Sequence, residues 1–205
     1  MLVKVCGITR KKQLDALDNL GIEMVGLNFY PSSKRYIEEP LLNTGLKAKR
    51  VGVFVNPTVS EVIKLVSQHS LDYVQLHGNE PLEVVAELAN RVPIIKAFGV
   101  AETFDFEVSK PYEPYVEYFL FDTLTPFFGG SGQKFNWQKL AEYKGGKSFL
   151  LSGGIQPEDA KMLGTLEHKR FAGIDINSGF EDSPGVKNIE LIKSFLSDIK
   201  HEKSR

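Results

Sequence analysis

Two glycine-rich turns near the end of the chain have the composition of a phosphate-binding site. The turn at residues 152–154 reads Ser-Gly-Gly and follows an apolar run, and the turn at residues 177–179 reads Asn-Ser-Gly and follows the next one. Glycines in such turns leave backbone N–H groups uncovered, and adjacent turns of this kind can hold an anion. Plain tight turns are the alternative, because most turn glycines have no other role. Two such turns after consecutive strands favour phosphate binding, and the candidate residues are Gly153, Gly154, Asn177, Ser178 and Gly179.

Six side chains that could perform acid–base or binding chemistry stand late in the predicted strands or in the loops that follow them. Each has an ordinary structural interpretation: buried cysteines are commonly inert, and an aspartate can cap a turn. Lys4 would lie on the same face of a strand as Cys6. Its ammonium would there favour the thiolate, which is the form of cysteine that acts as a base. The six side chains are Cys6, Arg35, Gln75, His77, Asp122 and Asp175.

The alternation of apolar runs with helix-like runs supplies a scaffold that brings these residues together. Alternating units of this sort need a parallel sheet with helical cover, and eight of them allow closure. We therefore predict a single (β/α)8 TIM barrel domain over residues 1–205, with an open, doubly wound sheet as the alternative. In such a barrel the chemistry lies at the carboxyl ends of the strands. The predicted strands are Leu2–Cys6, Met24–Phe29, Arg50–Val55, Tyr73–Leu76, Pro93–Phe98, Tyr118–Phe121, Phe149–Leu151 and Phe171–Ile176.

The helix signals differ in strength along the chain. Thr9 is a plausible N-cap for a helix over Arg10–Leu20, and an amphipathic helix over Val186–Ile199 is predicted to close the chain. Residues 100–114 contain two prolines, so we expect a short or distorted helix there. Asn136 is the expected cap of a further helix.

Composition excludes several classes of protein. The chain has 205 residues and a net charge of −1, so it carries no electrostatic footprint for nucleic acid or an acidic membrane. No apolar run approaches the ~20 residues of a membrane span. The single cysteine excludes an internal disulfide and a cysteine-rich metal cluster. The first residues lack the layout of a signal peptide, and the expected compartment is the cytoplasm.

A set of motifs carries a resemblance to a known family. Together, and in order from residue 3 to residue 185, they resemble the phosphoribosylanthranilate isomerases of tryptophan biosynthesis. The motifs are Val-Lys-Val-Cys-Gly-Ile-Thr at 3–9, Phe-Tyr-Pro-Ser-Ser-Lys-Arg-Tyr at 29–36, Val-Gly-Val-Phe-Val-Asn at 51–56, Val-Gln-Leu-His-Gly-Asn-Glu at 74–80, Phe-Asp-Thr at 121–123, Gly-Gly-Ser-Gly at 129–132, Leu-Ser-Gly-Gly-Ile at 151–155 and Gly-Ile-Asp-Ile-Asn-Ser-Gly at 173–179.

The resemblance implies a (β/α)8 barrel that carries out an Amadori rearrangement of an aminoaldose, N-(5-phosphoribosyl)anthranilate, to an aminoketose. It places the general base at Cys6 and the general acid at Asp122. It also places Arg35 opposite the anthranilate carboxylate and the last two turns at the phosphate. We further assign Gln75, His77 and Asp175 to substrate binding.

The chemistry of the residues agrees with these roles. Opening the furanose ring needs a proton on the ring oxygen, and burial at Asp122 would favour the carboxylic acid that delivers it. Cys6 as a thiolate could then take the C2 proton, although an ordinary thiol is only a few per cent ionised near neutrality and needs local help. The imine is itself the electron sink, so we expect neither a metal nor an organic cofactor. The glycine-rich loop at 123–134 could close over the site.

Other functions remain as alternatives. A metal-dependent pentose-phosphate epimerase would need converging ligands, and the four histidines form no evident cluster. An indole-glycerol-phosphate synthase would need a catalytic lysine and glutamates at strand ends. A non-catalytic barrel that senses a phosphosugar would need neither Cys6 nor Asp122. The expected partner is a small phosphosugar, with no nucleic acid or membrane, and the chain is expected to be a monomer or a homodimer.

Overall fold

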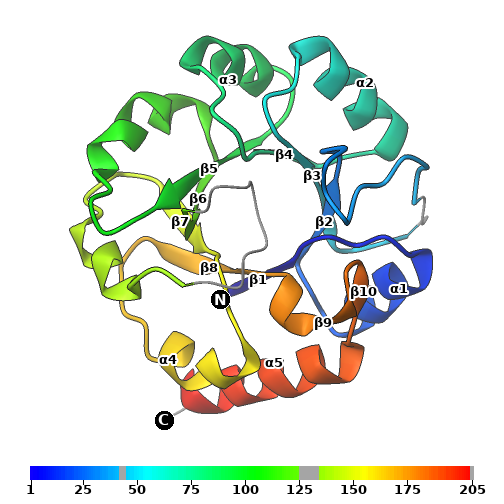
Figure 1. The fold of residues 1–205 in the computed structure, drawn as a ribbon, viewed down its shortest axis with the longest axis vertical. Coiled ribbons are helices and arrows are strands. Elements are labelled where there is room, and N and C mark those ends of the chain that lie inside the picture. The colour runs from blue at the N-terminus through cyan, green and yellow to red at the C-terminus, as the bar shows by residue number, and fades with distance from the viewer. Residues whose placement is uncertain (42–44, 125–133, 204–205) are drawn as a thin grey trace.

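Eight parallel strands close into a barrel (Figure 1). The computed structural model describes residues 1–41, 45–124 and 134–203. Within them the strands follow one another around the barrel in sequence order, and the last pairs with the first. The predicted (β/α)8 barrel is confirmed, and the open sheet is wrong. The strands are β1 (Leu2–Val5), β2 (Met24–Asn28), β3 (Lys49–Phe54), β4 (Tyr73–Leu76), β5 (Ile94–Val100), β6 (Tyr118–Thr123), β7 (Ser148–Leu151) and β8 (Phe171–Ile176).

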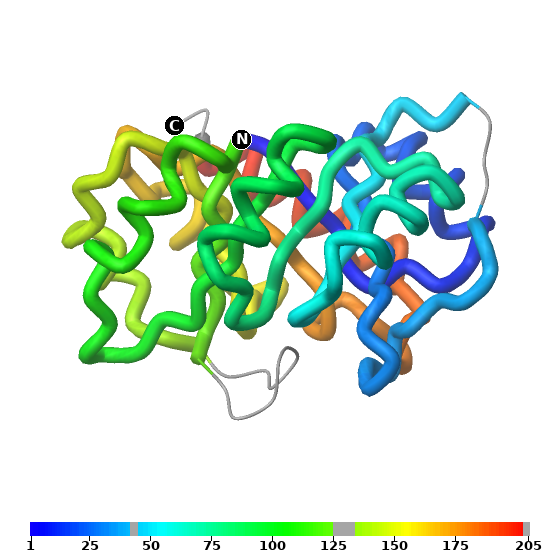
Figure 2. The backbone as a smooth tube through the Cα atoms, turned by 90° about the horizontal axis from the view of Figure 1, so that it is seen from above, coloured from blue at the N-terminus to red at the C-terminus, as the bar shows by residue number. Residues whose placement is uncertain are grey.

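Helices surround the barrel and follow most of its strands (Figure 2). The cover is uneven, because 3-10 helices stand after β5 and β6, and among the described residues no helix lies between β2 and β3. A small antiparallel pair, β9 (Glu181–Ser183) and β10 (Val186–Lys187), lies between β8 and the last helix. The helices are α1 (Lys11–Asn19), α2 (Val59–His69), α3 (Leu82–Ala89), η1 (Phe106–Tyr115), η2 (Trp137–Glu142), η3 (Pro157–Asp159), α4 (Ala160–Gly164), η4 (Ser178–Phe180) and α5 (Ile189–Lys203).

Several local expectations are corrected by the structure. Thr9 is not the N-cap of α1: the cap position is Arg10, and the Thr9 hydroxyl instead donates to the carbonyl of Gly185. The last helix does not begin at Val186, because residues 186–187 form β10. Asp122 lies inside β6 rather than just beyond its end.

Two other local expectations are confirmed. The region with two prolines forms the irregular 3-10 helix η1. Asn136 does cap the following helix, because its side chain accepts a hydrogen bond from the N–H of Gln138.

Alternation along the strands directs one set of side chains to the barrel interior. Apolar residues from five strands fill its lower part, and the next inward positions are polar on β6 and after β7. On β6, Leu120 is followed two residues later by Asp122, and after β7 Leu150 is followed by Ser152. The site therefore stands directly on a packed apolar floor. That floor consists of Met24, Val51, Ile95, Ala97, Leu120 and Leu150.

The outer core is largely aromatic where the helical cover is thin. Around β6 and β7 the rings of Phe106, Phe121, Tyr143 and Phe149 meet edge to face or tilted, and the centroid of Phe121 lies 4.9 to 5.2 Å from those of the other three. Large rings bury much apolar area per residue. They fill the space that a longer α-helix would otherwise cover.

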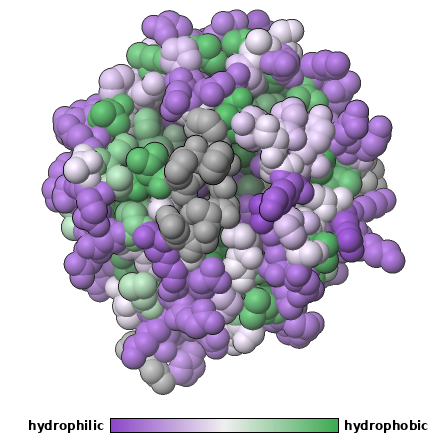
Figure 3. Space-filling model, in the orientation of Figure 1, coloured by the Kyte–Doolittle hydropathy of each residue, from purple (hydrophilic) through white to green (hydrophobic). Residues whose placement is uncertain are grey.

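The rim of the face seen in Figure 3 is mainly hydrophilic, with apolar residues scattered between the polar ones. Among the described residues, no helix is long and apolar enough to cross a membrane.

Candidate active site

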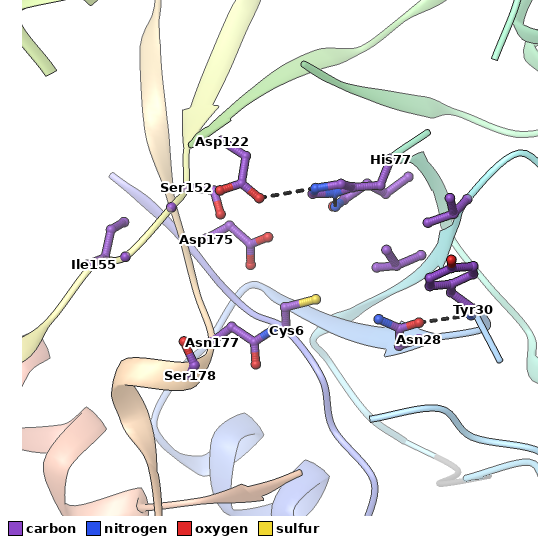
Figure 4. A pocket seen from close by; sticks show the side chains of 15 residues that line it. Cys6, Asn28, Tyr30, His77, Asp122, Ser152, Ile155, Asp175, Asn177 and Ser178 are labelled. Carbon is purple, nitrogen blue, oxygen red and sulfur yellow. Dashed lines mark hydrogen bonds and ion pairs between the residues drawn. The ribbon is translucent and has the colours of Figure 1, made fainter. Parts of the chain in front are cut away.

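One cavity of about 660 Å³ at the carboxyl ends of the strands gathers most of the predicted site residues (Figure 4). Side chains from β1, β6 and β8 point into it, and the turns after β7 and β8 form part of its wall. Arg35 and Gly179 do not line it. The cavity also has an apolar side that was not predicted, formed by Val53 and Val55 beside Asn28 and Tyr30. The predicted residues that do line it are Cys6, Gln75, His77, Asp122, Gly153, Gly154, Asp175, Asn177 and Ser178.

Cys6 lies beside a buried ion pair that joins β1 to β8. Lys4 is opposite Asp175 in the strand register, and its Nζ donates to Asp175 Oδ2 at 2.7 Å. The other oxygen, Oδ1, is buried and has no hydrogen-bond partner among the described residues. Burial lowers the pKa of Lys4, but its attraction to Asp175 and Cys6 outweighs this and leaves the pKa raised. Lys4 is therefore a permanent cation beneath the thiol.

The expectation that Lys4 makes Cys6 a thiolate is not met in the structure as it stands. Burial raises the pKa of the Cys6 thiol, and the pull of Lys4 in the opposite direction does not overcome it. Asp175 opposes ionisation of the thiol as well, because its carboxylate offsets the charge of Lys4. Cys6 is therefore a neutral thiol in the empty cavity.

Asp122 belongs to a short hydrogen-bonded series of side chains. His77 Nε2 is 3.1 Å from Asp122 Oδ2, and His77 Nδ1 is 2.8 Å from Gln75 Nε2. The other carboxyl oxygen, Oδ1, accepts from the N–H of Thr123 at 2.8 Å. Gln75 is buried, whereas His77 and Asp122 keep 17% and 15% of their side chains exposed. Both of these side chains can therefore exchange protons with water.

Arg35 lies next to the Cys6 loop, but it is engaged by a carboxylate that sequence reasoning missed. Its Nε and Nη2 donate to both oxygens of Glu181, with the shortest contact 2.6 Å. Lys187 Nζ is 2.6 Å from the same carboxylate and 2.7 Å from Asn177 Oδ1. Two cations thus share one anion beside the turn at residue 177. No motif marks Glu181 or Lys187 in the sequence, because they reach the site only through tertiary folding.

The two glycine-rich turns meet at the cavity as predicted. Gly153 and Gly154 have φ of +92° and +64°, a region that side-chain-bearing residues rarely adopt. A Cβ on Gly179 would lie 2.4 Å from the carbonyl oxygen of Ile155, so the second turn packs closely against the first. Glycine is thus required at these positions for backbone conformation or for close approach.

A second cavity of about 960 Å³ adjoins the first and shares His77 and Asp122 with it. Phe98, Phe104 and Tyr112 form its aromatic side. No group of three or more metal-binding side chains occurs within the described ranges. The glycine-rich segment at 129–132, expected in a closing loop, lies outside the described residues.

A closed (β/α)8 barrel with a thiol, a carboxyl group and two glycine turns at its carboxyl-terminal mouth defines the class of barrel enzymes that act on small phosphorylated sugars. The family described as "N-(5'phosphoribosyl)anthranilate (PRA) isomerase" matches residues 3–198. The chain belongs to this family and is an isomerase of tryptophan biosynthesis.

Named relatives cover almost the whole chain. The N-(5'-phosphoribosyl)anthranilate isomerase of Parabacteroides distasonis is 45% identical over 208 residues, which cover 98% of this chain and 94% of that protein. The enzyme of Phocaeicola vulgatus is 36% identical, with 98% and 99% covered.

Solved structures agree with this assignment. The phosphoribosyl anthranilate isomerase of Thermotoga maritima superimposes with a TM-score of 0.86 at 36% identity, covering 98% of this chain and 99% of that one. A phosphoribosyl anthranilate isomerase in complex with reduced 1-(o-carboxyphenylamino)-1-deoxyribulose 5-phosphate gives 0.83 at 33% identity, with 98% and 100% covered.

Proposed function

We propose that Cys6 and Asp122 are the base and the acid with which this isomerase converts N-(5'-phosphoribosyl)anthranilate to 1-(2-carboxyphenylamino)-1-deoxyribulose 5-phosphate. The observation that carries the proposal is that both groups line one cavity, from β1 and β6, with the two glycine turns in its wall. A sugar phosphate anchored at those turns would present its reacting carbons between the two groups.

Asp122 acts first, as an acid. It gives its proton to the furanose oxygen while the bond from that oxygen to C1 breaks, and the substrate nitrogen forms an imine with C1. Two observations support Asp122: its carboxyl group borders the cavity, and it is the carboxyl group that His77 contacts. Asp175 is less suited to the role, because one of its oxygens is held by Lys4.

Cys6 acts second, as a base on C2. Removal of the C2 proton by the thiolate gives an enolamine, and proton delivery to C1 with loss of the 2-hydroxyl proton gives the ketone. Because burial raises the pKa of Cys6 in the empty cavity, the thiolate needs a further positive charge nearby. The protonated imine formed in the first step supplies that charge at the atom next to C2, so the base becomes effective only after the ring has opened.

Arg35 meets the anthranilate carboxylate. Glu181 occupies its Nε and Nη2, and Lys187 shares the charge of Glu181, so the group as a whole stays cationic. Packing against Gly7, where an added Cβ would lie 2.5 Å from Arg35 Cδ, keeps the side chain next to the Cys6 loop. Gln75, His77 and Asp175 contact the sugar, and Asp175 Oδ1 is a ready acceptor for one of its hydroxyl groups.

The phosphate binds to backbone N–H groups of Gly153, Gly154, Ser178 and Gly179, with the side chain of Asn177 beside them. Their left-handed or closely packed backbone supports this role. The charge of Lys187, 2.7 Å from the Asn177 amide, adds a favourable potential at this end of the cavity.

The deciding experiment follows the fluorescence of freshly generated phosphoribosylanthranilate. Enzyme should abolish the anthranilate-type emission without added metal, and Cys6→Ser and Asp122→Asn should not. Emission that decays at the uncatalysed rate with wild-type protein would contradict the proposal and favour a sensor barrel. The partner is thus a small phosphosugar, and monomer and homodimer both remain compatible, since one relative from Thermotoga maritima is described as dimeric. We propose the cytoplasm as the compartment, which cell fractionation would test.

A further inference from the structure

The series Gln75, His77 and Asp122 contains one polar atom that the proposed reaction does not use. Gln75 is 1% exposed, and its Oε1 is buried with no hydrogen-bond partner among the described residues. Its Nε2 meanwhile faces His77 Nδ1 at 2.8 Å. An amide has a donor end and an acceptor end of nearly the same shape. A half-turn of this amide would therefore place an acceptor where a donor now stands.

The orientation of that amide determines which nitrogen of His77 carries the proton. With Nε2 of Gln75 donating to Nδ1, the neutral ring carries its proton on Nε2 and donates it to the Asp122 carboxylate at 3.1 Å. With Oε1 turned toward the ring, Nδ1–H donates to Gln75, and Nε2 accepts from a protonated Asp122. The first arrangement matches an acid that has given up its proton, and the second matches an acid that still holds it.

We propose that Gln75 and His77 are positioning residues that return a proton to Asp122 through this exchange of tautomers, which forms a proton relay. The relay rests on the proposed role of Asp122 as the acid. A proton from water binds Nδ1 while the Nε2 proton passes to Asp122 Oδ2, and the Gln75 amide turns to accept from Nδ1. Ring opening then moves the acid proton to the furanose oxygen, and the imidazole returns to its Nε2–H form by exchange with water. The proton taken up equals the one that leaves the 2-hydroxyl group as the ketone forms.

The position of His77 suits it to this exchange. Its side chain is 17% exposed and lies in the wall between the two cavities, so water can approach the ring from the second cavity while substrate fills the first. Gln75 itself is buried, so once Nδ1 has taken its proton the turned amide is the acceptor on that side of the ring.

Two ion pairs lie around the series formed by Gln75, His77 and Asp122. Asp175 on β8 interacts electrostatically with both His77 and Asp122, and Lys4 neutralises it at 2.7 Å. On the side of the second cavity, Lys96 and Glu80 form a pair at 2.8 Å. Burial has the largest influence on both pairs: it raises the pKa of Asp175 despite Lys4 and lowers the pKa of Lys96 despite Glu80. The test therefore compares variants that leave both pairs in place.

The test uses two substitutions at one position that should act in opposite directions. Gln75→Glu offers only an acceptor to Nδ1–H and should move the basic limb of the kcat/KM profile up by about one pH unit, a tenfold gain in rate on that limb. Gln75→Met removes the donor and the acceptor together, so the limb should move down only by the difference between the two lost hydrogen bonds, a smaller shift than that of Gln75→Glu and opposite in sign. KM should rise alike in both variants, because both lose the proposed contact of the Gln75 amide with the sugar while the phosphate and carboxylate contacts remain, so the opposite shifts of the limb are the readout. Gln13→Met, which deletes another buried glutamine amide, is the matched control and should leave the limb unchanged.

Nitrogen-15 spectra of the histidines give an independent reading, with the signal of His77 identified by its loss in His77→Gln. Nδ1 should lose its proton as the pH rises through the basic limb in the wild type but not in Gln75→Met, and circular dichroism should show both variants folded. If a charge at residue 75 prevents folding, the Gln75→Met limb and its spectrum decide alone. The relay is wrong if Gln75→Glu and Gln75→Met both keep the wild-type basic limb. It is also wrong if Nδ1 of His77 titrates in the same way in the wild type and in Gln75→Met. If either outcome is found and Asp122→Asn is inactive, only the relay is refuted. If Asp122→Asn is fully active, the proposed role of Asp122 as the acid is refuted.

Discussion

The substitution Gly153→Ala tests how closely the first glycine turn is fitted to the proposed acid. A Cβ built on Gly153 lies 2.3 Å from Thr123 Oγ1, 2.5 Å from Thr123 N and 2.7 Å from Asp122 Oδ1. Ordinary contact begins at 3.4 Å, so the turn and the end of β6 must separate by about 1 Å, the difference between 3.4 and 2.3 Å. That separation disturbs the bond by which the Thr123 N–H holds Asp122 Oδ1.

A displacement of about 1 Å at a catalytic group can cost about 100-fold in rate. We therefore expect kcat/KM of Gly153→Ala to fall about 100-fold. A left-handed backbone also costs an alanine about 1 to 2 kcal/mol, partly offset by about 0.4 to 1 kcal/mol from the stiffer unfolded chain. The free energy of unfolding should thus drop by about 1 kcal/mol before any effect of the clash.

Gly21→Ala separates these two effects. Gly21 has a similar φ of +75°, but nothing lies within 4 Å of a Cβ built on it. It should lose about 1 kcal/mol in urea unfolding and keep the wild-type kcat/KM in the fluorescence assay. Equal activities of the two alanine variants, both near wild type, would refute the argument that the turn holds Asp122 in place.

Further predictions concern the other groups of the cavity. Cys6→Ser should lower kcat by about 100-fold to 10,000-fold without unfolding the protein. The pH profile of alkylation of Cys6 should have its midpoint above pH 9.0, because burial raises the pKa of the thiol and only the thiolate reacts. A midpoint below 9.0 would show that Lys4 prevails over burial. Asp122→Asn should lower single-turnover rates by a similar factor with modest change in KM. Arg35→Met should raise KM about 10-fold to 100-fold with kcat nearly intact, since it loses a contact common to ground and transition states. The reverse pattern would exchange the two roles. Gly154→Asp should weaken inhibition by inorganic phosphate through like-charge repulsion, and an unchanged inhibition constant would move the phosphate away from this turn.

The sequence was sufficient for the fold because each strand is a short apolar run that ends at a turn residue. All eight runs are strands, and the residues late in them converge at one mouth because parallel strands in a barrel end on the same side. Cys6 and Asp122 could be placed at one cavity for the same reason: their place in the strand order determines where their side chains lie.

Features that depend on residues far apart in the chain could not be predicted from the sequence. Arg35 and Glu181 are 146 positions apart, and their pairing follows from where β9 lies relative to the loop after β2. The direction of the Cys6 pKa shift escaped as well. Burial in the closed barrel is its largest cause, and Asp175, which adds to it, lies 171 positions after Lys4. Thr9 had the composition of a cap, yet Gly185 offered its hydroxyl a tertiary acceptor.

The seam between β1 and β8 has a consequence for the order in which a ribosome completes this enzyme. Cys6 is made well before Asp175, the ion-pair partner of Lys4, which follows Lys4 by 171 positions. Until β8 emerges, the barrel stays open, the ammonium of Lys4 lacks its anion, and the turn at residue 177 does not exist. The proposed site is therefore assembled by the same event that closes the sheet. A chain released early carries the thiol and the carboxyl group but has no site in which they act together.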